Sequence, residues 1–113
     1  MIYFLPTEFN CPCCGLNDMS SEVYMKIDAI RGKLGVPLHI NSGMRCIKHN
    51  AEVGGKTDSM HLLGKALDVS LLNLPVEKRH EFLELVHSEF NGVGIAKTFI
   101  HMDIRQKKAG WVY

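Results

Sequence analysis

Two residues that can bind a metal ion, Asp68 and His101, lie inside stretches whose other residues are typical of buried strands. Because a buried carboxylate without a partner costs several kcal/mol, such a residue is normally paired or ligates a metal. His61 precedes Asp68 by seven positions, across Gly64, so the intervening loop can fold back and bring both side chains to one point. Two histidines and one aspartate, with a fourth position left to water, form the ligand set of a catalytic zinc site.

By itself this spacing is weak evidence, because a histidine seven positions before an aspartate occurs often by chance. The other histidines have simpler interpretations as surface residues or as hydrogen-bonded core residues. They are His39, His49, His80 and His87. We expect the last two to be exposed on a helix, and we assign none of the four to the metal.

Two long helices are predicted from apolar residues that recur at helical spacing. The first begins at Ser20 or Ser21, either of which can cap it, and ends at Gly35. The second opens at Asn73 and Pro75, because proline suits the first turn of a helix. Its predicted buried stripe consists of Val76, Phe82, Leu83, Val86 and Phe90.

Strands are predicted to carry two of the three candidate ligands. Residues 66–72 alternate around Asp68, and residues 98–104 alternate so that His101 and Asp103 share a face. A shorter strand is predicted over 36–40, a helical turn over 47–53, and a turn at Gly92 and Gly94. Helices and strands that do not alternate strictly predict an α+β domain with two long helices and a small antiparallel sheet.

The composition is that of one ordinary globular domain spanning residues 1–113. Of its 113 residues, 46% are hydrophobic and 22% charged, which is enough for one modest core and too little for two. The net charge of +1 argues against strong attraction to nucleic acid or to anionic membranes. No stretch approaches the ~18 apolar residues of a membrane span. We therefore expect a monomer without nucleic-acid or membrane partners.

Four elements follow one another along the chain, the last three of them within residues 42–70, SGMRCIKHNAEVGGKTDSMHLLGKALDVS, and 99–105, FIHMDIR. They are an N-terminal helix, a Ser-Gly-x-Arg turn, a Ser-x-His-x6-Asp stretch and a strand bearing a histidine. In this order the chain resembles the zinc D-alanyl-D-alanine carboxypeptidase family. That family includes D,D-dipeptidases, L-alanyl-D-glutamate endopeptidases of phages and, as a fold relative, the hedgehog signalling domain. The resemblance implies a hedgehog-like or D,D-peptidase-like fold and a zinc metallopeptidase that cuts peptidoglycan stem peptides or cross-links.

Carried over position by position, the resemblance makes His61, Asp68 and His101 the ligands of one catalytic zinc. Arg45 matches the arginine that contacts the substrate carbonyl and stabilises the oxyanion, a task that a fixed cation performs well. Ser59 matches a serine that binds the substrate or orients the site. The loop that shapes the cleft matches Asn50, Gly54 and Gly55.

The match departs from the family pattern at the general base. Better-known members carry a glutamate three residues before the last histidine ligand, and here that position is Thr98, which cannot transfer the proton. Asp103 is the obvious substitute, and the His-x-Asp-x-Arg ending resembles a subgroup of small, often phage-borne members. Asp103 could instead orient a ligand by a hydrogen bond or pair with Arg105. The reserve candidates for the base are Glu52 and Asp58.

Four cysteines lie outside this constellation: Cys11, Cys13 and Cys14 in FNCPCCG, and Cys46 directly after Arg45. They could form a second, structural zinc site, which needs four sulfur or nitrogen ligands. They could instead form a disulfide between the N-terminal loop and Cys46, or remain free buried thiols. The sequence leaves these three states open.

Two functions from different classes remain for the whole chain. The first is a zinc metallopeptidase of the D-Ala-D-Ala carboxypeptidase type, and the second is a zinc-containing binding or structural module without catalysis. The N-terminal residues MIYFLPTEFN have none of the features of a signal peptide, so we expect synthesis in the cytosol. An endolysin-like phage or prophage protein released to the cell wall fits this expectation, and so does a cytoplasmic enzyme.

Overall fold

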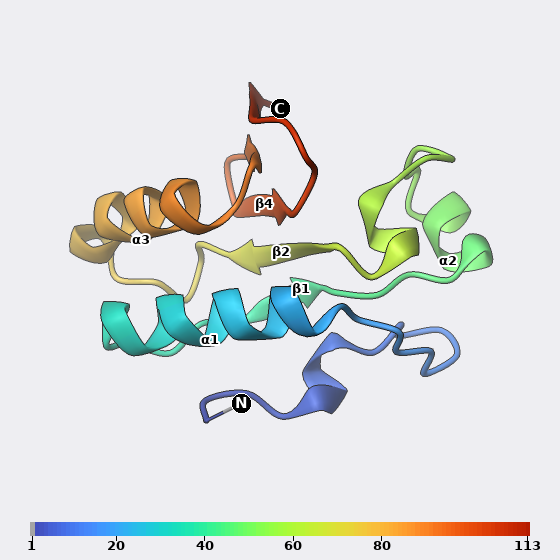
Figure 1. Ribbon diagram of the computed structural model, residues 1–113, viewed down its shortest axis with the longest axis horizontal. Coiled ribbons are helices and arrows are strands. Elements are labelled where there is room, and N and C mark those ends of the chain that lie inside the picture. Colours follow the sequence, from blue (N-terminus) through green and yellow to red (C-terminus); the bar gives the residue numbers. More distant parts are fainter. Residues whose placement is uncertain (1) are drawn as a thin grey trace.

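The computed structural model describes residues 2–113 and, within them, five strands, three α-helices and two short 3-10 helices (Figure 1). In chain order these are η1 (Pro6–Phe9), α1 (Ser21–Leu34), β1 (Ile40–Ser42), α2 (Ile47–Glu52), η2 (Met60–Leu63), β2 (Ala66–Ser70), α3 (Val76–Glu89), β3 (Gly92–Ile95), β4 (Phe99–Asp103) and β5 (Ala109–Val112). The predicted α+β class is confirmed.

All five strands belong to one sheet with the order β1-β2-β4-β3-β5. Neighbouring strands run antiparallel except β3 and β5, which are parallel. The sheet is therefore mixed, where the sequence suggested an antiparallel one, because β5 pairs with β3 and not with β4, which precedes it in the chain. At the centre, β2 pairs with β4 in a register that sets Asp68 directly opposite His101.

The ends of the long helices follow from their capping residues. The hydroxyl of Ser20 accepts a hydrogen bond from the backbone N–H of Glu22, and Gly35 ends α1 with φ of 78°, which favours glycine. Pro75 precedes α3 as predicted, but Val76 is 73% exposed and does not belong to the buried stripe. No helix within residues 2–113 is both long and apolar enough to span a membrane.

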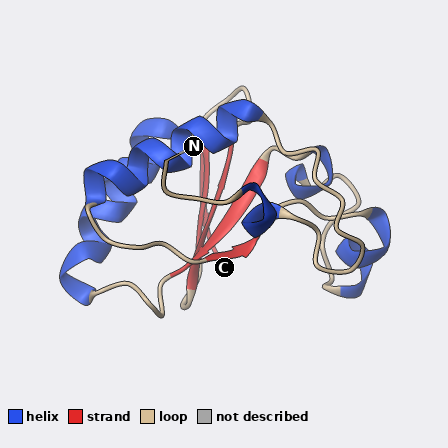
Figure 2. Cartoon of the chain, turned by 90° about the horizontal axis from the view of Figure 1, so that it is seen from below, coloured by secondary structure: helices blue, strands red, loops and turns tan. Residues whose placement is uncertain are grey.

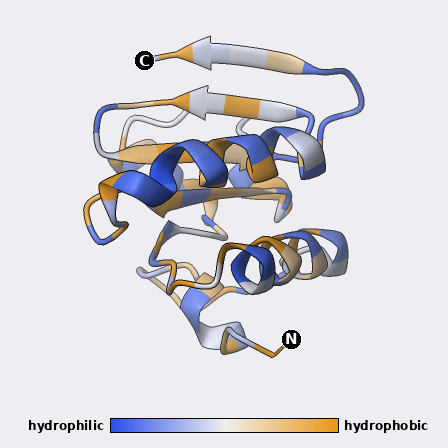
Figure 3. Cartoon of the chain, turned by 90° about the vertical axis from the view of Figure 1, so that its left-hand side faces the viewer, coloured by the Kyte–Doolittle hydropathy of each residue, from blue (hydrophilic) through white to orange (hydrophobic). Residues whose placement is uncertain are grey.

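The core lies between the sheet and the two long helices, which gather on one side of the strands while α2 and η2 lie on the other (Figure 2). Both long helices carry hydrophilic and hydrophobic positions along their turns (Figure 3). Burying each large apolar side chain contributes about 1.5–3 kcal/mol. The main contributors from the central strands and helices are Val23, Ile27, Leu67, Val69, Phe82, Val86, Ile100 and Met102. The other side of the sheet is thereby left for polar chemistry.

Two of the three predicted strands and the predicted helical turn are found close to their expected positions. The strands over 66–72 and 98–104 appear as β2 and β4, and the helical turn over 47–53 appears as α2. The strand predicted over 36–40 was wrong in its limits, because only Ile40 of that segment belongs to β1. Pro37 lies in the excluded part, and a proline has no N–H to donate to a strand ladder.

The turn predicted at Gly92 and Gly94 was wrong, because both glycines lie within β3. Both positions lack the space for a side chain. A Cβ atom on Gly92 would collide with the side chains of Asp103 and Arg105, and one on Gly94 would collide with the ring of Trp111. Strand β5 was not predicted at all.

Candidate metal centre

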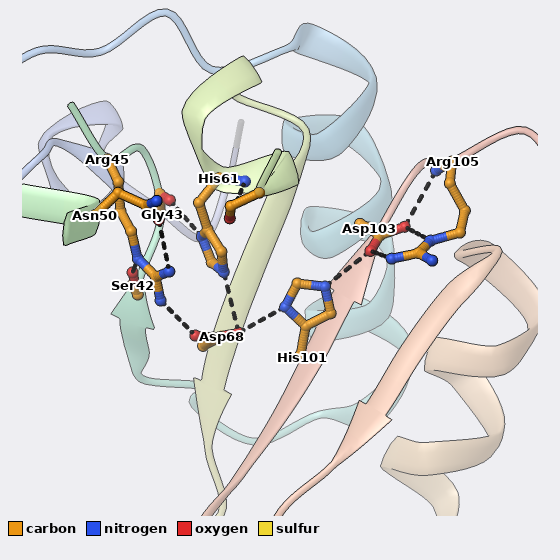
Figure 4. A network of polar contacts seen from close by, with 10 residues as sticks. Ser42, Gly43, Arg45, Asn50, His61, Asp68, His101, Asp103 and Arg105 are labelled. Carbon is orange, nitrogen blue, oxygen red and sulfur yellow. Dashed lines mark hydrogen bonds and ion pairs between the residues drawn. The ribbon is translucent and has the colours of Figure 1, made fainter. Parts of the chain in front are cut away.

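Three potential metal ligands converge where η2 meets the two central strands (Figure 4). His61 comes from η2, Asp68 from β2 and His101 from β4, and all three side chains are buried. Their ligand atoms lie within 4.8 Å of one another. The strand register brings Asp68 and His101 together, and η2 adds the third side chain.

The polar atoms at the centre of this cluster suit a cation. Oδ1 of Asp68 lies 3.0 Å from Nδ1 of His101 and 3.3 Å from Nε2 of His61. The contact at His61 is not a hydrogen bond, so its buried Nε2 has no hydrogen-bond partner in the described part of the chain. Leaving such an atom unpaired costs about 1–3 kcal/mol, which a shared metal ion would remove. Two imidazoles and one carboxylate also match the ligand preference of zinc, so the residues fit that ion.

Backbone contacts fix the orientation of the His61 ring. Its Nδ1 lies 2.8 Å from the carbonyl oxygen of Gly43, which can only accept, so Nδ1 carries the hydrogen and Nε2 keeps a free lone pair. The backbone N–H of His61 donates to the hydroxyl of Ser59, which caps η2, and Gly64 ends η2 in a left-handed conformation. The lone pair of Nε2 therefore faces the carboxylate of Asp68.

Asp103 holds His101 from the side opposite Asp68 (Figure 4). Its Oδ2 accepts a hydrogen bond from Nε2 of His101 at 2.8 Å, which leaves Nδ1 to face Asp68. The guanidinium of Arg105 donates to both oxygens of Asp103, at 2.8 and 2.7 Å. The carboxylate of Asp103 is fully buried and is not among the groups that line the pocket. This geometry favours the orienting role and disfavours the interpretation of Asp103 as a base.

The electrostatics of the cluster keep its carboxylates ionised. Burial tends to raise the pKa of Asp68, but the neighbouring imidazoles of His101 and His61 outweigh it and hold that pKa well below its usual range. Burial likewise opposes ionisation of Asp103, and the hydrogen bonds from Arg105 and His101 lower its pKa in spite of it. The two carboxylates in turn raise the pKa of His101 against the effect of burial. The ionised carboxylates therefore favour a positive charge between them, either a proton on His101 or a metal ion.

A pocket of about 770 Å³ opens above the three ligands. Its charged lining consists of Arg45, Lys56, Asp58, Asp68 and Arg105. Aromatic side chains from the end of the sheet form another part of the wall, namely Phe99, Trp111 and Tyr113. A peptide segment could therefore reach the metal-binding atoms from solvent.

The family model described as Peptidase M15 matches residues 3–103. The chain belongs to this family. It is the zinc D-Ala-D-Ala carboxypeptidase family, which the sequence motifs resembled, and its members depend on zinc. The matched residues include His61, Asp68 and His101 but not β5. No curated protein matches the chain. Membership therefore indicates zinc-dependent peptidase chemistry in general terms.

Arg45 lies in the wall of the pocket beside the cluster of His61, Asp68 and His101. Its Nη2 lies 3.2 Å from Oδ2 of Asp68, its Nε donates to the hydroxyl of Ser42, and its Nη1 donates to Oδ1 of Asn50. A Cβ atom on Gly55 would collide with Asn50, so this glycine leaves room for the contact. The guanidinium is thus held in one place with its charge facing the pocket.

Some of the other residues considered for the site line the pocket and others do not. Ser59 and Asp58 line it, whereas Thr98 is exposed outside it and Glu52 lies on the exposed end of α2. Lys56, Trp111 and Tyr113 also form the wall and were not predicted. Trp111 is the only tryptophan in the sequence and follows the basic run after Asp103. Had β5 been predicted, this residue could have been placed near the site.

Proposed function

We propose that this M15 peptidase hydrolyses peptide bonds in peptidoglycan stem peptides or cross-links, as a D,D-carboxypeptidase or endopeptidase. The observation that carries the proposal is the buried cluster of two histidines and one aspartate at the floor of an open pocket. Its unpaired Nε2 on His61 and its ionised carboxylates supply what a divalent metal requires. Family membership supports a zinc-dependent peptidase, and the pocket wall supports the substrate class.

His61, Asp68 and His101 would hold a zinc ion, which would supply Lewis-acid chemistry, namely polarisation of a carbonyl group and a lower pKa for a water molecule. Arg45 acts beside it. Its guanidinium, fixed by Ser42 and Asn50, would donate hydrogen bonds to the carbonyl oxygen as negative charge develops there. Because the charge is already in place, little reorganisation is needed during the reaction.

Two carboxylates divide the remaining tasks. Asp103 is a positioning residue, because its hydrogen bond to Nε2 of His101 sets which ring nitrogen faces the metal position. Asp58 lines the pocket from the exposed loop before Ser59, and apart from Asp68 it is the only acidic side chain in that lining within residues 2–113. We therefore assign the proton transfer to Asp58 in place of the absent glutamate at position 98.

The cationic wall supports a substrate that carries free carboxylates. Arg45, Lys56 and Arg105 all line the pocket, and Arg105 also lies 4.7 Å from the ring centre of Trp111. Peptidoglycan stem peptides carry carboxylates at their C-terminal D-alanine and on their acidic residues. Charge complementarity of this kind selects a substrate and speeds its encounter with the site.

The direct test is cleavage of defined peptidoglycan fragments. The zinc-loaded protein is incubated with purified muropeptides, with cross-linked dimers and with intact sacculi, and the products are identified by mass spectrometry. We expect release of D-alanine or of an un-cross-linked peptide by the wild type and no release by His61→Ala. If the zinc-loaded wild type leaves every fragment intact, the proposed substrate class is wrong.

A second candidate function is a zinc-containing binding or structural module of the same fold. The observation that favours it is Thr98, which is exposed outside the pocket and provides no carboxylate near the ligands. Binding without turnover in the same fragment experiment, measured by isothermal titration calorimetry, would support this alternative. Turnover that depends on Asp58 would exclude it.

A further inference from the structure

The four cysteines form a second cluster outside the pocket. Cys11, Cys13 and Cys14 come from the loop between η1 and α1, and Cys46 is the residue that caps α2. Their sulfur atoms lie within 4.8 Å of one another, although Cys46 is separated from the others by more than thirty positions. All four are free thiols. The fold therefore brings every cysteine of the chain to one place.

The backbone around these cysteines is shaped to direct the sulfurs inward. The N–H of Cys11 donates to the carbonyl of Leu16, and the N–H of Gly15 donates to the carbonyl of Cys11, both at 2.8 Å. These bonds close a tight loop in which Gly15 adopts φ of 77°, a conformation that favours glycine. Three sulfurs are thereby presented together toward the start of α2.

Backbone N–H groups are directed at two of the sulfur atoms. The N–H of Cys46 donates to Sγ of Cys11 and the N–H of His49 donates to Sγ of Cys46, both at 3.4 Å. Hydrogen bonds of this kind stabilise the thiolate, which is the form of cysteine that binds a metal. Two backbone N–H groups therefore donate hydrogen bonds to sulfur atoms of the cluster, in addition to the contacts among the four side chains.

The spacing of the sulfurs suits a tetrahedral ion. With Zn–S bonds of about 2.3 Å, ligand sulfurs at the corners of a tetrahedron lie about 3.8 Å apart. Sγ of Cys13 and Sγ of Cys46 lie 3.3 Å apart, and no pair in the cluster exceeds 4.8 Å. A disulfide would need only two converging sulfurs, whereas four ligands with no open position are the arrangement of a structural zinc site.

We propose that Cys11, Cys13, Cys14 and Cys46 bind one structural Zn²⁺, separate from the metal held by the two histidines and Asp68. The ion joins the N-terminal loop to the segment that carries Arg45, the residue directly before Cys46. That segment already contacts the N-terminal region through the N–H of Met44, which donates to the carbonyl of Phe9 at 2.9 Å. The ion would therefore hold the backbone next to Arg45 from outside the pocket, whose lining includes none of the four cysteines.

The first test counts and identifies the metal in the protein purified with its native metals. We expect about two zinc ions per chain in the wild type and about one in a His61→Ala, His101→Ala double variant, because the thiolate site remains in the variant. X-ray absorption at the zinc edge of that variant should give four sulfur neighbours at about 2.3 Å. No zinc in the double variant, or zinc with nitrogen and oxygen neighbours, would overturn the proposal. Neither result depends on whether the protein cleaves peptidoglycan.

The second test removes one sulfur and keeps a matched control. Cys13→Ser should lose about one zinc per chain. Met25→Ser removes the sulfur of a residue that is 72% exposed on α1 and should lose none. Circular dichroism checks that both variants fold. Thiol titration of the denatured, chelator-treated wild type should find all four cysteines reactive. If only two react, the cysteines form a disulfide and the proposal is wrong.

Discussion

The two clusters of potential metal ligands are carried by different kinds of structural element. Asp68 and His101 face each other across the central strands and are 8% and 7% exposed, and His61 is buried beside them. The cysteines lie on a loop and at the start of a short helix, and Cys13 and Cys14 are exposed. The sheet ladder holds the first cluster in shape, whereas the second depends on a few loop hydrogen bonds.

This difference indicates what each proposed ion would contribute. Asp68 and His101 are already held in place by the strands and need no metal to come together. The proposed ion at this cluster would therefore act in catalysis. Ligands on a loop gain their order from the ion, so its binding free energy serves the fold. The following predictions test this division, beginning with the largest expected effect.

Removing a ligand from the cluster of His61, Asp68 and His101 should abolish activity with little effect on folding. We expect His61→Ala to lower kcat/KM by roughly 1,000-fold or more, since the metal supplies several kcal/mol of transition-state stabilisation. The thermal midpoint should change by only a few degrees. The matched control is His87→Ala, an exposed histidine on α3 that should keep full activity. A His61→Ala enzyme as active as His87→Ala would contradict the proposed centre.

Removing the fixed cation should be the next largest effect. Arg45→Ala should lower kcat by about 100- to 1,000-fold, because a donor aimed at the developing oxyanion is lost. Zinc content should stay unchanged, which separates this effect from loss of the metal. Arg31→Ala on α1, whose guanidinium lies over the ring of Tyr3, serves as the control. An Arg45→Ala loss confined to KM would mean that the arginine only binds the substrate.

The roles assigned to the two carboxylates can be separated by zinc titration. Asp103→Asn should weaken zinc affinity by about 10- to 100-fold and recover most activity at saturating zinc, because it only positions His101. Asp58→Asn should keep the zinc affinity and lose activity at every zinc concentration. Competition with a chelator measures the affinities, and muropeptide turnover measures the activity. The reverse pattern would make Asp103 the base.

Filling the space behind Asp103 should destabilise the fold. Gly92→Ala places a Cβ atom against the carboxylate of Asp103 and should lower the free energy of unfolding by about 1–3 kcal/mol. Gly110→Ala on β5 is the matched control, since its Cβ atom would meet only the carbonyl of Val93 at 3.8 Å. Urea unfolding of both variants gives the comparison. Equal stabilities would show that Gly92 has no such role.

Removing a cysteine sulfur should have the smallest effect on catalysis. We expect Cys13→Ser to lower kcat by less than about tenfold, because the thiolate site acts on the pocket only through the backbone of Arg45. Limited proteolysis should instead detect faster cleavage of the N-terminal loop. A loss as large as that of His61→Ala would mean that the cysteines belong to the catalytic centre itself.

Features that depend on local chemistry could be predicted from the sequence. Ser20 and Gly35 mark the ends of α1 because capping is a property of a few neighbouring residues. Asp68 and His101 stood out because polar residues inside apolar strands require a reason. Convergence of the ligands followed from the family resemblance, and the structure places their ligand atoms together.

Features that depend on distant neighbours could not be predicted. Gly92 and Gly94 suggested a turn, whereas their actual requirement is space for Asp103 and Trp111, which come later in the chain. The role of Asp103 depends on which nitrogen of His101 faces Asp68, and no sequence pattern records the orientation of a ring. Strand β5 was missed because its parallel pairing with β3 is not a local property.

The register between β2 and β4 ties the assembly of the site to the folding of the sheet. A slip of one position would set Leu67 or Val69 opposite His101 and would turn Asp68 toward the apolar layer. The backbone amides of these two strands should therefore be among the slowest to exchange with deuterium, even in protein stripped of metal. Amide exchange could then follow the formation of the catalytic geometry during refolding, before any substrate or ion is added.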